Sequence, residues 1–317
     1  MEYNVALSEL VPGMEVQGYY VLRDAQIKKT STGKPYLSAQ LSDATGSVDA
    51  KLWDYNGALD PSDNGRIVLV RAQAQDFRGA VQLTIGRFRF AAEQDRDKYD
   101  LTRLVPSAPI DASAAVESVR AFARSIEDED YRRICERLLE RHIESFSVIP
   151  AAKSVHHAFR SGLLMHTESM LRLADFLADS YSGVIDRSLL IAGTMLHDFA
   201  KEKEFTLSAL GLVTEYSVAG ELLGHLVMGA QEVADTAREL GVPEEKSMLL
   251  QHMLLSHHGS PELGAAVKPK CAESELLSYI DLIDSRMEIY AEAFENTPAG
   301  EFTPRIFALE KRVYKHN

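Results

Sequence analysis

Cysteine is scarce in this sequence, which contains only Cys135 and Cys271. Two cysteines so far apart indicate neither a disulfide framework nor a thiolate zinc site, so any metal has to be bound by histidine and carboxylate. Long hydrophobic runs are missing too, because no apolar stretch approaches the roughly 18 to 20 residues that cross a bilayer. The N-terminal residues lack the basic start and apolar core of a signal peptide. We therefore expect a cytoplasmic protein with no membrane partner.

Positive charge is also in deficit, since the net charge is -13. That value argues at first against a nucleic-acid partner, because phosphate binding usually needs a basic face. The deficit is uneven, however: residues 1–90 carry as many Lys and Arg as Asp and Glu, so the rest of the chain holds the whole acidic excess. The first part is neutral overall and contains a local basic stretch.

A chain of 317 residues favours two domains over one. Residues 16–90 alternate apolar and polar positions in five short runs, separated by the turn signals STGK, DATG, PSDNG and FRG. Five strands in so short a span predict a small closed barrel such as an OB-fold, with another plain β-barrel as the alternative. Residues 91–112 lose this periodicity and contain two prolines, which predicts a linker.

After the linker, apolar residues recur at helical spacing. The predicted helices lie within residues 117–126, 131–146, 162–181, 187–201, 221–240, 245–258 and 273–294. The predicted fold class is therefore multidomain: an all-β OB-fold-like barrel at 1–90, a linker at 91–112 and an all-α helical bundle at 113–317.

Histidine is concentrated in the helical part, where eight of the ten histidines fall between His156 and His258. A single histidine on an apolar helix face is more often a core or surface residue than a ligand. Here, however, successive predicted helices each carry a candidate, and facing helices of a bundle can direct such side chains to one interior point. An aspartate inside the apolar run LLSYIDLI is also costly to bury without a partner. The candidate ligands are His166, His197, Asp198, His225, His257, His258 and Asp281.

Imidazole and carboxylate ligands without thiolate suit manganese, iron, cobalt, nickel or zinc. Seven candidates exceed what one ion needs, and two ions about 3.5 to 4 Å apart, bridged by a carboxylate, would suit phosphodiester hydrolysis. We expect one or two divalent ions, manganese first, with cobalt, iron, nickel, zinc and magnesium as alternatives.

The same residues carry a family resemblance. His166, the doublet His197-Asp198 and Asp281 resemble the H…HD…D signature of the HD-domain metal-dependent phosphohydrolases. The strings HHAFRSGLLMHT, GELLGHLVMGA and LLSHHGS, after an OB-like N-terminal part, resemble the YhaM family of 3'-5' exoribonucleases more specifically, from about Val16 to the string RIFALEKR.

This resemblance implies a metal-dependent enzyme that releases 5'-mononucleotides from the 3' end of single-stranded RNA, and of single-stranded DNA in some cases. It implies that the signature residues are the core ligands and that His225, His257 and His258 bind the second ion. Two departures bear on it. HDFAK replaces the commoner HDIGK, and Gly162 stands where some two-metal relatives carry a glutamate, which leaves the second ion open.

Two further residue sets follow from this chemistry. Asp198 and Lys201 are the predicted catalytic residues, Asp198 by orienting the nucleophile and Lys201 as a point charge near the phosphate. The alternative for Lys201 is a solvated residue in the charged stretch KEKE. His157 and Arg160 are predicted to bind a substrate phosphate.

The barrel is predicted to hold the single strand through a basic groove and stacking aromatics. Lys28, Lys29, Lys34, Tyr36 and Trp53 are the candidates, with Phe77 a weaker one; core aromatics and solvated lysines are the alternatives. Two other functions stay open: an HD phosphohydrolase acting on nucleotides or cyclic dinucleotides, and a non-catalytic nucleic-acid-binding protein. The acidic helical surface is also compatible with a homo-oligomer.

Overall fold

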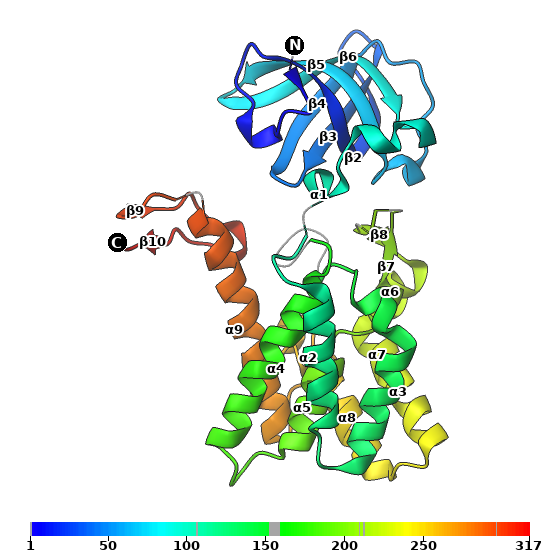
Figure 1. The fold of residues 1–317 in the computed structure, drawn as a ribbon, viewed down its shortest axis with the longest axis vertical. Helices are drawn as coiled ribbons and strands as arrows, with labels where there is room; N and C mark the ends of the chain where they lie inside the picture. Colours follow the sequence, from blue (N-terminus) through cyan, green and yellow to red (C-terminus); the bar gives the residue numbers. More distant parts are fainter. Residues whose placement is uncertain (1, 106, 152–158, 209, 212, 296) are drawn as a thin grey trace. The chain divides into compact units, whose positions relative to one another are not determined.

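The computed structural model describes residues 2–105, 107–151, 159–208, 210–211, 213–295 and 297–317. The chain forms two compact units (Figure 1). The barrel unit comprises Met1–Ser107 and Leu207–Thr214, and the helical unit comprises Ala108–Thr206 and Glu215–Asn317. Among the described residues, no helix combines the length and the apolar character needed to cross a membrane.

Five strands close the barrel. β2 pairs with both β3 and β5, so the strand order β2-β3-β4-β6-β5 returns to β2. β4 and β6 pair in parallel and the other barrel pairs are antiparallel, which is the Greek-key arrangement of an OB-fold. The strands of this sheet are β1 (Glu2–Tyr3), which pairs with β2, β2 (Glu15–Lys29), β3 (Pro35–Asp43), β4 (Gly46–Trp53), β5 (Ile67–Phe77) and β6 (Ala80–Phe90).

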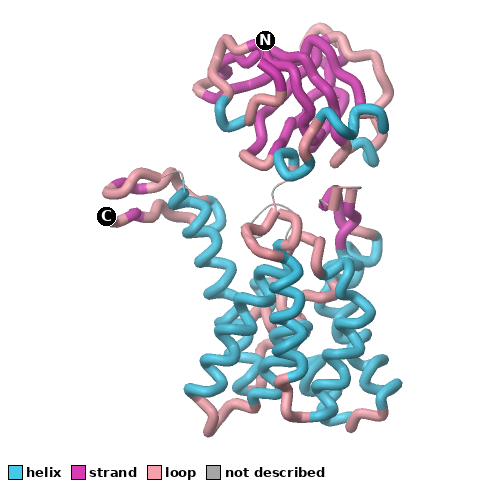
Figure 2. Tube along the Cα trace, in the orientation of Figure 1, coloured by secondary structure: helices cyan, strands magenta, loops and turns pink. Residues whose placement is uncertain are grey.

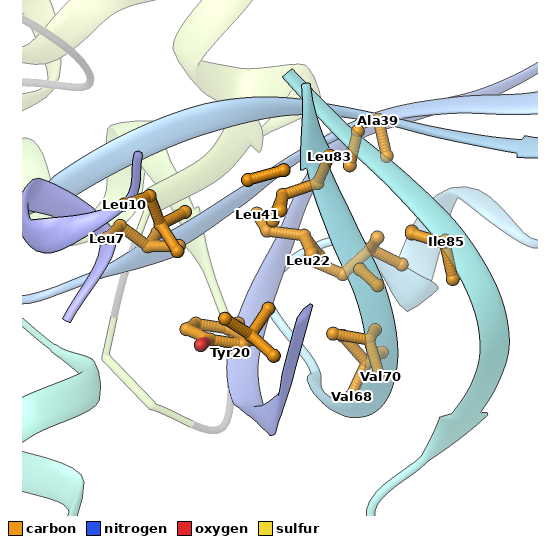
Figure 3. Close-up of a cluster of buried hydrophobic side chains, with 14 of the residues drawn as sticks. Leu7, Leu10, Tyr20, Leu22, Ala39, Leu41, Val68, Val70, Leu83 and Ile85 are labelled. Atoms are coloured by element: carbon orange, nitrogen blue, oxygen red, sulfur yellow. The ribbon is translucent and has the colours of Figure 1, made fainter. Parts of the chain in front are cut away.

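Alternate side chains of these strands fill the barrel interior. Leu22, Leu41, Val70 and Leu83 are fully buried together, one from each of four strands (Figure 3). Because successive side chains of a strand point to opposite faces, the intervening positions face outward. This alternation is the pattern from which the sequence predicted strands.

Residues 91–107 and 207–214 complete the barrel unit. The first segment, predicted as part of a linker, contains η3 (Glu93–Lys98) and α1 (Leu101–Leu104). Its Asp95 is fully buried and accepts hydrogen bonds from Arg89, Lys98 and Tyr19. The second segment belongs to the hairpin of β7 (Phe205–Leu207) and β8 (Val213–Tyr216), and its Leu210 packs on a cluster formed by Tyr19, Val21, Ile67, Leu104 and Val105.

The helical unit is a bundle built around α5 (Figures 1 and 2). Nine consecutive residues of α5, Ser188 to Leu196, are buried, and α5 packs against α2, α3, α4, α8 and α9. The helices are α2 (Ala112–Arg124), α3 (Glu129–Phe146), α4 (Gly162–Ser180), α5 (Arg187–Leu196), α6 (Lys201–Glu204), α7 (Val218–Leu240), α8 (Glu244–Ser256) and α9 (Ala272–Glu295). The small pair β9 (Glu301–Phe302) and β10 (Tyr314–Lys315) follows α9.

Short 3-10 helices lie at η1 (Leu7–Glu9), η2 (Pro61–Asp63), η4 (Pro261–Leu263) and η5 (Phe307–Leu309). The predicted fold class, an OB-fold-like barrel followed by an all-α bundle, is confirmed by the strand order and the helical elements.

Candidate metal centre

Five parts of the bundle bring histidine and aspartate side chains into one buried region. α5 ends at Leu196, so the next two residues leave the most buried helix of the unit inside its core, where their side chains are 1% and 4% exposed. The sequence doublet His197-Asp198 is therefore interior because α5 is interior. The other candidates come from α4 (His166), α7 (His225), the residues directly after α8 (His257 and His258) and α9 (Asp281).

The ligand atoms fall into two groups, and within each group all of them lie within 4.8 Å of one another. The first group comprises His166, His197 and Asp281. Its His166 Nε2 lies 3.3 Å from Asp281 Oδ1 and 3.3 Å from His197 Nε2. The second group comprises Asp198, His225, His257 and His258.

Asp198 faces both groups with different oxygens. Its Oδ2 lies 3.3 Å from His197 Nε2, while its Oδ1 lies 3.1 Å from His225 Nε2 and 3.6 Å from His257 Nε2. A carboxylate placed in this way can bridge two cations.

Four buried atoms of the second group make no hydrogen bond to any described residue: Asp198 Oδ1, His225 Nε2, His257 Nε2 and His258 Nδ1. His225 Nε2 and His257 Nε2 lie 3.1 and 3.6 Å from Asp198 Oδ1 without hydrogen-bond geometry, and buried polar atoms that are not hydrogen-bonded are costly and rare. Three imidazole nitrogens and one carboxylate oxygen are a donor set that suits a divalent metal ion. The predicted divalent cofactor therefore fits the residues that are present.

In four of the histidines, the Nδ1 atom, which lies on the side of the ring away from the cluster, has a hydrogen-bond partner. His197 Nδ1 lies 2.8 Å from the carbonyl oxygen of Thr194, and His257 Nδ1 lies 2.7 Å from that of Leu254. His166 Nδ1 lies 2.7 Å from Asp284 Oδ2, and His225 Nδ1 lies 2.9 Å from Glu204 Oε1. In the neutral ring, an Nδ1–H donor at each position leaves Nε2 as the acceptor, so each of these rings, once neutral, presents a coordinating nitrogen to the interior.

Charge states differ among the members of the cluster: Asp198 and His258 are ready to bind a cation, whereas burial lowers the pKa of His225 but its contacts with Asp198 and Glu204 raise it overall. Burial raises the pKa of the Asp198 carboxyl group, but Lys201 and His197 outweigh burial and hold that pKa well below its usual range. Burial lowers the pKa of His258 to about 3, and His257 acts in the same direction. Burial alone would lower the pKa of His166, whereas its hydrogen bonds with Asp281 and Asp284 raise it to about 9. A bound ion therefore has to displace a proton from His166.

Lys201 lies against the cluster rather than in solvent. Its Nζ is 2.6 Å from Asp198 Oδ2 and donates to the carbonyl oxygen of Ala151 at 2.8 Å, and its side chain is 14% exposed. The ammonium group compensates the buried carboxylate, and its burial argues against the alternative of a solvated residue.

A cavity of about 560 Å³ opens over the cluster. Its polar wall includes Lys201, Glu204 and most of the candidate ligands, and its apolar wall includes Phe205, Leu263 and Leu282. Tyr216 and Tyr279 also line the cavity, with 42% and 52% of their surfaces exposed. The size lies within the range of about 300 to 1,000 Å³ that small-molecule sites occupy.

The remaining predicted residues lie elsewhere. Arg160 is exposed in the helical unit, and His157 falls outside the described residues. On the barrel, Lys28, Tyr36 and Trp53 form one row across β2, β3 and β4, because strand register places Tyr36 opposite both of the others. The Tyr36 and Trp53 rings lie 4.9 Å apart, and Trp53 is 48% exposed.

The flanking lysines and Phe77 are also at the barrel surface. Lys29 and Lys34 are exposed, and Lys34 lies 3.4 Å from Asp54. Phe77 is 52% exposed beneath the Arg78 guanidinium. Because these aromatics are not core residues, the alternative of a purely structural role loses support.

Two residues that contact the cluster, Glu204 and Asp284, are not among the site residues predicted from the sequence. Glu204 lies in the charged run KEKE, which resembles a solvated helix surface. Asp284 follows Asp281 by three residues, one helical turn away on the same side of α9, and that spacing was the only available signal.

Comparison with known proteins bears on the whole chain. An HD domain model matches residues 163–286, the span that contains every candidate ligand. The 3'-5' exoribonuclease YhaM of Bacillus subtilis is 36% identical over 316 residues, which cover 99% of this chain and 98% of that protein. The chain belongs to the YhaM exoribonuclease family. The Halalkalibacterium halodurans member is also 36% identical, over 96% of this chain and 94% of its own length.

YhaM-family membership confirms the resemblance inferred from the sequence. Among solved structures, the second OB-fold domain of replication protein A from Methanococcus maripaludis aligns with 28% of this chain and 96% of its own. Its sequence identity is 18% and its TM-score is 0.24. The OB-fold assignment of this YhaM-family barrel rests on its strand order.

Proposed function

We propose that this protein is a metal-dependent 3'-5' exoribonuclease that hydrolyses single-stranded RNA to 5'-mononucleotides. Single-stranded DNA is the second proposed substrate. The observation that carries the proposal is the buried cluster in which Asp198 faces two ligand groups. Its family relatives are named for this activity.

The chain provides one ligand set for each of two divalent ions. His166, His197, Asp281 and Asp198 Oδ2 would hold the first, and His225, His257, His258 and Asp198 Oδ1 the second. Bound ions lower the pKa of water and neutralise charge on the phosphate oxygens. Manganese is the first candidate among the several divalent metals that suit imidazole and carboxylate donors without thiolate.

Residues of the cavity would position the 3' end of the strand. Lys201 keeps Asp198 in place and adds positive charge where the phosphate binds. Tyr216 and Tyr279, both exposed in the cavity wall, offer ring faces on which the terminal base can stack. Arg160 and His157 remain the proposed contacts to a further phosphate.

The barrel would hold the strand through the row of Lys28, Tyr36 and Trp53. A lysine beside a half-buried tyrosine ring and an exposed tryptophan ring combines backbone attraction with base stacking, which is how OB-folds bind single strands. The β2–β3 turn, with Lys29 and Lys34, and the outer face of β3 and β4 are the regions that such folds use.

The test is a time course of 5'-labelled single-stranded RNA with Mn(II), with and without chelator, resolved at single-nucleotide spacing. A metal-dependent ladder that shortens from the 3' end is expected. Strand binding without shortening in any divalent metal would indicate a binding protein instead. Neither cutting nor binding would indicate a phosphohydrolase of small nucleotides.

A further inference from the structure

Glu204, the last residue of α6, holds one candidate ligand at two points. Its Oε1 lies 2.9 Å from His225 Nδ1 and accepts a hydrogen bond from the His225 backbone N–H at 3.1 Å. Glu204 is only 8% exposed. A single carboxylate oxygen therefore sets both the ring orientation of His225 and the start of the helical segment that carries it.

The four-residue helix α6 is anchored along its whole length. Lys201 pairs with Asp198, Glu202 with His142 and Ser145 of α3, and Lys203 with Glu232 of α7. These contacts hold the backbone of α6, from which the Glu204 side chain extends.

Two glycines of α7 allow the close approach of Glu204. A Cβ atom at Gly220 would lie 2.3 Å from the Glu204 carbonyl oxygen, so only glycine fits there. Gly224 interrupts the helix with φ 71° and ψ 161°, a conformation that is essentially confined to glycine. This break directs the next N–H, that of His225, towards Glu204.

Asp284 plays the matching part in the other ligand group. Its Oδ2 lies 2.7 Å from His166 Nδ1, and its side chain also interacts with Ser169. His197 and His257 use backbone carbonyl oxygens for the same purpose. Each group thus contains one histidine held by a carboxylate, and carboxylate partners fix the tautomer and raise the basicity of a metal-binding imidazole.

We propose that Glu204 and Asp284 are positioning residues that set the affinity of the two metal sites separately. Glu204 acts on the second site through His225, and Asp284 acts on the first through His166. The inference rests on the two-ion centre proposed above. It predicts that either site can be weakened while the other keeps its affinity.

The experiment is calorimetric titration of Mn(II) into the full-length, chelator-treated chain. Two equivalents are expected to bind the wild-type protein. Glu204→Gln keeps the size and an acceptor oxygen but removes the charge, and should weaken one equivalent by roughly 10- to 100-fold. Asp284→Asn is the matched variant and should weaken the other equivalent by a similar factor.

A third substitution assigns the sites. His258→Ala removes a ligand of the second group only, so adding Glu204→Gln to it should cause little further loss, whereas adding Asp284→Asn should weaken the remaining equivalent. Exonuclease rate provides an independent readout: raising the Mn(II) concentration should restore the Glu204→Gln rate, which it would not do for a misfolded protein. If Glu204→Gln does not fold, Glu204→Asp, which keeps the charge but shortens the side chain, replaces it.

Wild-type affinity of Glu204→Gln for both equivalents would overturn the inference, as would an equal weakening of both. If the wild-type chain binds fewer than two equivalents, the two-ion centre itself is wrong. The wild-type titration distinguishes the two failures: two equivalents bind if only the inference on Glu204 and Asp284 is wrong, and fewer bind if the two-ion centre is wrong.

Discussion

At the scale of single residues, Asp198 is the carboxylate that the two ligand groups share. The Oδ2 atom of Asp198 lies beside His197 and Lys201, and its Oδ1 atom lies beside His225. Replacing the whole carboxylate by a neutral side chain would change both groups at once, unlike the loss of any one histidine.

Asp198→Asn should abolish hydrolysis while leaving the fold and strand binding largely intact. The amide nitrogen is a donor without a coordinating lone pair, and the substitution removes the charge that two cations need. The gel ladder measures activity, and fluorescence anisotropy with labelled RNA measures binding. Asp235→Asn, at an exposed position of α7, is the control and should behave as the wild-type protein does. Full activity of Asp198→Asn would remove the basis of the proposed site.

Gly224→Ala should destabilise the protein by about 1 to 3 kcal/mol or displace His225, because φ 71° with ψ 161° is strained for a residue with a Cβ atom. Urea unfolding gives the free-energy change, and Mn(II) titration reports on the site. Gly183→Ala is the matched control, since no atom lies within 4 Å of its added Cβ and its φ is not positive. Equal behaviour of the two variants would contradict the argument.

At the scale of elements, the four charged residues of α6 link neighbouring parts of the bundle through ion pairs. Its partners lie in α3, α7 and the loop after α5. His142 of α3 is central to this connection, because its ring lies between Glu202 of α6 and Glu232 of α7.

His142 makes the stability of the bundle pH-dependent. Burial lowers its pKa, but the hydrogen bonds with Glu202 and Glu232 outweigh burial and raise it to about 9, from an ordinary value of 6.5. Below pH 6.5 the ring is protonated in both the folded and unfolded chain, so its ion pairs contribute fully. Between pH 6.5 and 9 only the folded chain keeps the proton, and the contribution, up to about 3 kcal/mol, is lost as pH rises.

Urea unfolding of the wild-type protein and of His142→Gln at pH 6.5 and pH 9 measures this contribution. The wild-type protein should lose up to about 3 kcal/mol more than the variant between the two pH values. Parallel losses in both proteins would show that the pKa of His142 is not raised in the fold.

At the scale of the whole molecule, chemistry and strand binding are assigned to different units. The chain passes between the units three times, after residues 107, 206 and 214, because the tip of the β7–β8 hairpin belongs to the barrel unit. The acidic excess lies outside the barrel strands, so the barrel carries the basic and aromatic row without a large opposing charge of its own.

Trp53→Ala should weaken the binding of a long single strand by about 1 to 3 kcal/mol, which is roughly 5- to 150-fold, because one stacking platform is lost. KM should rise with kcat unchanged. Hydrolysis of a dinucleotide, too short to need the barrel, should be unaffected. Phe176→Ala, which removes a 66% exposed ring from α4, is the control. An equal effect on the dinucleotide would place Trp53 outside the strand-binding surface.

The sequence by itself determined the fold class and the seven candidate ligands. Strand alternation and helical spacing are local patterns, and burying histidine and aspartate on apolar helices is costly enough to indicate a shared site. Only the tertiary structure decided which residues hold those ligands, since Asp284 and His166 are 118 residues apart and Glu204 and His225 are 21 apart. The cross-strand row of Lys28, Tyr36 and Trp53 likewise depends on register, which pairing between strands sets. Long-range contacts of this kind leave no local pattern, because each partner taken alone is compatible with an ordinary surface position.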